Sequence, residues 1–129
     1  MPRIFFIIAA GSAFMAVAAG AFGAHGLRGK LDPELLAVFE IAVRYQMYCA
    51  LALIGVSFAG TQWPGKFINA GGWLLVIGSL LFSGSLYLLS LTGIKGLGAI
   101  TPIGGVLLLA GWLCLAIGAF KSSRRGMNA

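Results

Sequence analysis

The residues best suited to chemistry follow one another closely between positions 40 and 48. Glu40 and Arg44 are four residues apart, and the acid comes first, which is the favourable order for an ion pair on one helix face. Tyr45, Gln46 and Tyr48 follow directly. An ionisable group inside a membrane helix is costly unless it is paired or near the interface. Such residues are therefore candidates for a functional site.

Four roles are open to these residues. The first is structural, because Glu40 and Arg44 at headgroup depth can pair with each other or clamp the ends of helices. The second is a pocket for a small ligand or a lipid headgroup, and the third is a path for protons or ions. Catalysis is the least favoured role, because the sequence contains no nucleophile–base pair, metal-ligand set or phosphate-binding loop. The candidate polar site consists of His25, Glu40, Arg44, Tyr45, Gln46, Ser83, Ser85, Tyr87 and Thr101.

The pairing of Glu40 with Arg44 is a specific expectation. A guanidinium carries five donors in a fixed fork, and one carboxylate cannot fill all of them. Unfilled donors are costly at membrane depth. We therefore expect Arg44 to contact Glu40 and also loop carbonyls or the segment around His25.

A long helix must position these residues. Asp32 is a good N-cap, and Pro33 suits the first helical position, where no amide donor is needed. Nothing interrupts a helix from Pro33 to Ala59, and its length of roughly 40 Å exceeds the roughly 30 Å hydrocarbon core of a bilayer. The first turns should therefore lie at the interface, and the remaining turns should cross the membrane.

The composition predicts an integral membrane protein. The chain has 129 residues, of which 60% are hydrophobic and only 9% are charged, whereas soluble domains carry about 25% charged residues. The first apolar block is longer than a usual signal-peptide core, so we expect a retained span. The predicted fold is all-α, a single domain over residues 1–129 that forms a four-helix antiparallel bundle. Its membrane helices are expected at about 4–24, 33–59, 67–91 and 100–120.

The basic residues indicate orientation rather than nucleic-acid binding. The net charge is +6, but the basic residues are dispersed between apolar blocks and form no stripe. One side of the membrane would hold Arg3, Lys66, Lys121, Arg124 and Arg125, and the other Arg28, Lys30 and Lys95. This asymmetry predicts that both termini lie in the cytoplasm.

The two cysteines do not suggest a metal site. Cys49 and Cys114 lie in apolar helices without metal-ligand spacing, and we expect two free, buried thiols. No metal and no cofactor are predicted.

Small residues recur at helical spacing and predict close helix packing. Ordinary intramolecular packing is favoured over a subunit interface. The glycines at positions 71, 72, 78 and 84 could loosen the third helix. The packing positions are Ser12, Ala16, Gly20 and Ala24 in the first helix, and Gly104, Gly111 and Gly118 in the fourth.

Five motifs occur in order along the chain: GAFGAH at 20–25, YQ at 45–46, LFSGSLY at 81–87, TPIGG at 101–105 and AGW at 110–112. Together they resemble the YgdD-like family of small membrane proteins of unknown function. The resemblance implies four transmembrane helices and a bacterial-type inner membrane, and it implies no reaction. Members of that family often carry a histidine three residues after YQ, where this chain has Cys49. A metal site that needs two histidines is therefore weakened.

Two functions remain, and neither is enzymatic. The favoured one is a structural or interaction protein that associates with itself or with other membrane proteins. The alternative is binding or transport of a small molecule or lipid through the polar site near Glu40 and Arg44. Transporters usually show internal repeats and broken helices at mid-membrane, and neither is evident here.

Overall fold

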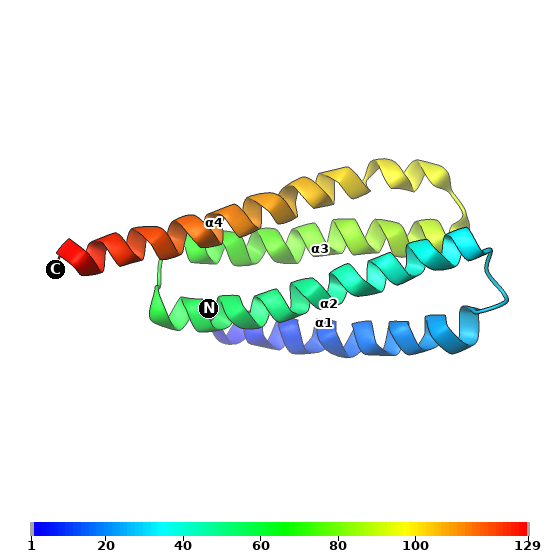
Figure 1. Ribbon diagram of the computed structural model, residues 1–129, viewed down its shortest axis with the longest axis horizontal. Coiled ribbons are helices and arrows are strands. Elements are labelled where there is room, and N and C mark those ends of the chain that lie inside the picture. The colour runs from blue at the N-terminus through cyan, green and yellow to red at the C-terminus, as the bar shows by residue number, and fades with distance from the viewer. Residues whose placement is uncertain (1, 129) are drawn as a thin grey trace.

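The computed structural model describes the backbone of residues 2–128 and the side chains of residues 2–122. Four helices are long and apolar enough to cross a membrane, and they run antiparallel to their neighbours, so both chain ends lie at one end of the bundle (Figure 1). The prediction of an all-α, four-helix membrane bundle is therefore confirmed. The helices are α1 (Pro2–Phe22), α2 (Pro33–Gln62), α3 (Lys66–Thr92) and α4 (Thr101–Asn128).

The start of α2 follows its local sequence. The Asp32 side chain accepts a hydrogen bond from the backbone N–H of Glu34 at 3.3 Å, and Pro33 is the first helical residue. The helix continues beyond the expected end at position 59, because no breaker occurs before Pro64. The amide of Trp63 closes it by donating to the carbonyl of Ala59 at 2.7 Å.

The helical backbone after α1 extends beyond the expected end of the first helix at about position 24. The helix continues into a π-helical turn, η1 (Gly23–Leu27), and the left-handed residue comes later, at Gly29 with φ of 84°. Gly23 serves close packing instead, since a Cβ there would lie 2.8 Å from the Phe39 ring. A second short element, the 3₁₀ turn η2 (Lys95–Ala99), leads into α4.

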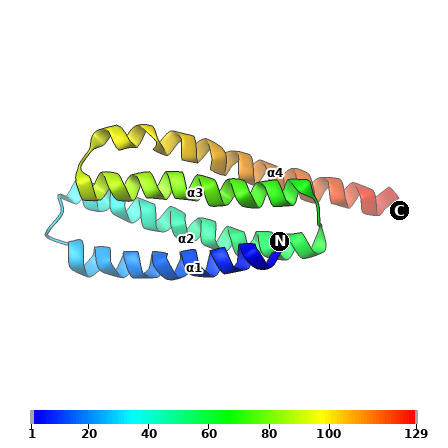
Figure 2. The same cartoon turned by 180° about the vertical axis from the view of Figure 1, so that it is seen from behind.

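The bundle is open on one side. Among the described residues, the extensive helix contacts join chain neighbours: α1 with α2, α2 with α3, and α3 with α4. The ribbon views show α2 running between α1 and α3 (Figures 1 and 2). The first turns of α1 do reach α3, where the rings of Phe5 and Trp73 lie 5.2 Å apart. A core that includes Phe5, Leu53, Val56, Ile68 and Leu75 surrounds this contact.

Glycines bring α3 and α4 into backbone contact. A Cβ on Gly111 would lie 3.1 Å from the carbonyl oxygen of Gly71, and a Cβ on Gly71 would lie 3.0 Å from that of Gly111. Gly104 and Gly78 repeat this arrangement seven residues away. A Cβ on Gly104 would lie 2.9 Å from the carbonyl oxygen of Gly78, and a Cβ on Gly78 would lie 3.1 Å from that of Gly104. Gly71 and Gly78 therefore do not loosen α3, which is continuous from Lys66 to Thr92. They allow α4 to approach it closely.

The small residues of α1 face α2. Ala16 is fully buried, and a Cβ on Gly20 would lie 3.4 Å from Cγ1 of Val43. The carbonyl of Ser12 accepts a hydrogen bond from Gln46 in the same interface. Ala24, the last of the four, is exposed in the π-helical turn. Most of this stripe is thus used inside the chain.

Candidate functional site

A large cavity forms a groove between α1 and α3. It encloses about 690 Å³, with α1 and α3 as its walls and α2 as its floor. It runs from Ile8 to Phe22 along α1, a distance of roughly 21 Å at the helical rise. Aliphatic and aromatic side chains dominate its lining, and none of the lining residues is charged. We call this cavity the α1–α3 groove.

A hydrogen-bonded pair of side chains lies on the groove. The Tyr87 hydroxyl donates to Oε1 of Gln46 at 2.6 Å, and Nε2 of Gln46 donates to the carbonyl of Ser12 at 3.2 Å. Aromatic side chains on a helix point toward its N-terminus, so Tyr87 reaches from the end of α3 back toward the middle of α2. The Phe39 ring packs edge-on against Tyr87 at 5.1 Å and holds it in place. We call these residues, Ser12, Gln46 and Tyr87, the polar floor.

The polar floor retains hydrogen-bonding capacity. A glutamine side chain has two N–H donors and two acceptor lone pairs, and the protein bonds of Gln46 within the described residues use one of each. Every fully buried side-chain nitrogen and oxygen in the described part of the chain has a partner. Gln46 lines the groove, so a ligand there with a hydroxyl or carbonyl group can use the capacity left over.

Glu40 and Arg44 lie on the exposed face of α2, away from the groove. In residues 2–122 neither side chain forms an ion pair, so the expected contact is not made. Their spacing does place them on one helix face, but that face points outward.

The other predicted site residues separate into three places. Gln46 and Tyr87 meet on the groove, and the Ser83 hydroxyl, which also lines it, donates to the Ala42 carbonyl at 2.9 Å. The hydroxyls of Ser85 and Thr101 meet 2.6 Å apart and join α3 to α4. His25 and Tyr45 are exposed. Cys49 is buried and Cys114 is half-buried, both as free thiols.

Sequence reasoning missed three residues that shape the groove. Ser12 was assigned to packing, although its carbonyl completes the polar floor. Gly11 and Gly84 open directly onto the groove, because a Cβ at either position meets nothing within 4 Å. The spacing of small residues cannot distinguish a glycine beside a void from a glycine beside another helix, so no sequence signal marked Gly11 or Gly84.

The chain is similar to several bacterial membrane proteins. A family model described as "Protein of unknown function (DUF423)" matches residues 19–105. A UPF0382 membrane protein of Staphylococcus saprophyticus is 52% identical over 92% of this chain and 98% of its own length. The UPF0382 membrane protein YwdK of Bacillus subtilis is 46% identical with the same coverage. No solved structure matches the chain. The chain belongs to the UPF0382 family of membrane proteins, whose function is unknown.

Proposed function

We propose that this protein binds one neutral, elongated lipid or lipid-like molecule in the α1–α3 groove. The observation that carries the proposal is a long apolar cavity with Gln46 and Tyr87 exposed along it. Its volume falls within the roughly 300–1,000 Å³ that small-molecule sites occupy. The hydrocarbon part of the ligand lies along the groove, and its hydroxyl or carbonyl group bonds Gln46.

The shape of the groove suits a single extended chain. It holds about 690 Å³ over a length of roughly 21 Å, so it is elongated. An extended hydrocarbon chain is narrow, and it runs along the bilayer normal, as the groove does.

The lining chemistry favours a neutral ligand. No charged side chain lines the groove, and an unpaired charge at membrane depth is costly. An uncharged polar group is less demanding, and interhelical hydrogen bonds of this kind in membranes contribute roughly 0.6–2 kcal/mol. The alternative role in protein association has less support, since the small residues of α1 and α4 pack within the chain.

Blocking the groove tests this proposal. Gly84→Phe places a ring in the groove without a clash at its Cβ. We expect the wild-type protein, purified in mild detergent, to retain about one neutral lipid-like molecule per chain, and the variant to lose most of it. The measurement is mass spectrometry of the extracted lipids. Gly55→Phe is the matched control, because Gly55 is exposed, equally unobstructed and outside the groove.

The outcome separates the two candidate functions. Equal lipid content in Gly84→Phe and Gly55→Phe would contradict the proposal. A change in oligomeric state in Gly84→Phe alone, at unchanged lipid content, would assign the groove to a second copy.

The orientation remains a separate expectation. We expect both termini in the cytoplasm of a cell with an inner, or plasma, membrane, because five basic residues lie on the side of the chain ends and three on the other side. A reporter that is active only outside the cytoplasm, fused after Ala129, should stay silent. Strong reporter activity would reverse the orientation and leave the four spans intact.

We also expect no enzymatic activity, because the polar floor lacks an activated nucleophile and a base to activate it.

The resemblance to YgdD-like proteins supports the view that the YgdD-like proteins form another branch of the UPF0382 family.

A further inference from the structure

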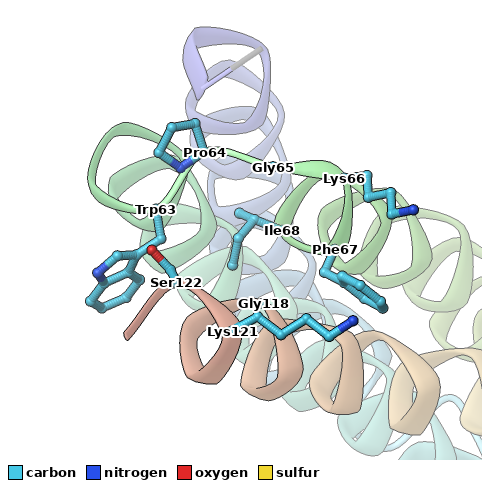
Figure 3. A pocket seen from close by; sticks show the side chains of 9 residues that line it. All are labelled: Trp63, Pro64, Gly65, Lys66, Phe67, Ile68, Gly118, Lys121 and Ser122. Atoms are coloured by element: carbon cyan, nitrogen blue, oxygen red, sulfur yellow. The ribbon is translucent and has the colours of Figure 1, made fainter. Parts of the chain in front are cut away.

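A second, smaller cavity lies at the end of the bundle that holds both chain ends. It encloses about 180 Å³ between the α2–α3 turn and α4. Trp63, Lys66 and Phe67 line one side, and Gly118 and Lys121 line the other (Figure 3). We call it the basic pocket. It is separate from the α1–α3 groove and shares no residue with it.

Two lysines from different helices line the basic pocket. Lys66 begins α3, Lys121 lies near the end of the α4 span, and both side chains are exposed. The Lys121 Nζ lies 4.4 Å from the centre of the Phe67 ring, in a cation–π contact that positions this ammonium. Figure 3 shows both ammonium groups on the side of the pocket away from Trp63, with the Phe67 ring next to Lys121.

No acidic side chain balances these lysines. The three acidic residues are Asp32, the N-cap of α2, and Glu34 and Glu40 in the first turns of that helix. The nearest in sequence, Glu40, precedes Trp63 by 23 residues, or roughly 35 Å along the helix. An anion in the pocket would therefore meet two positive side chains and no carboxylate side chain.

The backbone adds to the positive potential. Gly65 is the N-cap of α3 and provides no side-chain cap, in contrast to Asp32 at the start of α2. The first amides of α3 therefore lack intrahelical partners beside Lys66, and a helix N-terminus favours an anion. Trp63, which is 40% exposed, is a residue type enriched at the membrane–water interface. A tryptophan at the end of a span therefore places the pocket at the depth of the lipid headgroups.

We propose that the basic pocket binds the phosphate of an anionic phospholipid headgroup, held by Lys66, Lys121 and the first amides of α3. The bilayer is the source of the ligand, because the pocket lies at interfacial depth and opens beside membrane-spanning helices. This proposal does not depend on the ligand of the α1–α3 groove.

Titration of the purified full chain with phosphatidylglycerol and phosphatidylcholine, followed by native mass spectrometry, tests the proposal. One basic side chain near a membrane surface contributes roughly a fivefold factor in affinity for anionic lipid. We expect Lys66→Gln and Lys121→Gln each to weaken phosphatidylglycerol binding about fivefold, and the double variant on the order of 25-fold. Phosphatidylcholine binding should not change.

Two controls make the result specific. Arg3→Gln removes an exposed charge at the same end of the bundle but outside the pocket, so it should preserve the affinity. Lys66→Arg with Lys121→Arg keeps both charges and should preserve it too. An equal loss of phosphatidylglycerol affinity in Arg3→Gln would contradict binding in the pocket and indicate a diffuse attraction to the basic surface. Displacement of the lipid by inorganic phosphate at equal concentration would overturn the lipid as its ligand.

Discussion

Gly104→Ala is expected to destabilise the protein by about 3 kcal/mol, at the upper end of the usual cost of overpacking. The added Cβ would lie 2.5 Å from the backbone nitrogen of Phe82, 2.8 Å from its Cα and 2.9 Å from the carbonyl oxygen of Gly78. All three atoms belong to the backbone, so no side-chain rotation relieves the contact. The helix α4 must move away from α3 and lose the reciprocal approach of Gly71 and Gly111.

The neighbouring residue provides the matched control. In Gly105→Ala the nearest atoms, in the Phe82 ring, lie 3.8 Å from the new Cβ, which is an ordinary contact. Alanine is favoured over glycine inside a helix by up to about 1 kcal/mol, so this variant should be equally or more stable than the wild type. The measurement is the free energy of unfolding in mixed micelles. Equal losses in the two variants would show that α3 and α4 do not make this backbone contact.

Gln46→Leu is expected to cost about 1–3 kcal/mol, because it removes both hydrogen bonds of the polar floor and leaves the Tyr87 hydroxyl without its acceptor. Tyr87→Phe should cost about 1 kcal/mol, since Gln46 keeps its bond to Ser12. The double variant should lose less than the sum of the two single losses, because neither group is then left without its partner.

Tyr48→Phe controls for the loss of a phenolic oxygen. Tyr48 lies two residues after Gln46 on α2 and is 56% exposed. We therefore expect a change within about 0.5 kcal/mol, as for other surface substitutions. Strictly additive losses in Gln46→Leu and Tyr87→Phe, measured by the same unfolding assay, would contradict the bond between them.

The helices and their local signals could be predicted from the sequence, because they depend on neighbouring residues. Asp32 and Pro33 define the start of α2 through contacts within one turn, and the uncharged apolar blocks define the spans. The packing positions Gly104, Gly111 and Gly118 of α4 could be predicted from the regular spacing of small residues. Gly71 and Gly78 of α3 are seven residues apart, as are Gly104 and Gly111 of α4. This shared spacing identifies the two α3 glycines as the packing partners of the two α4 glycines.

The direction in which Glu40 and Arg44 point could not be predicted. Lipid is as apolar as a helix interface, so the apolar residues of α2 surround the helix and do not distinguish its inner face from its outer face. The pairing of Gln46 with Tyr87 joins residues 41 positions apart and depends on how α2 and α3 pack. The groove exists because α1 and α3 do not pack against each other along its length. The absence of packing leaves no recognisable pattern in the sequence of either helix.

The most direct test of lipid binding in the α1–α3 groove is an experimental density map of the protein in a lipid nanodisc. We predict one elongated density, roughly 20 Å long, between α1 and α3, with its polar group within hydrogen-bonding distance of Gln46. Gly84 and Gly11 should lie against it. A groove filled by side chains of a second copy, or closed by direct packing of α1 on α3, would contradict the proposed function.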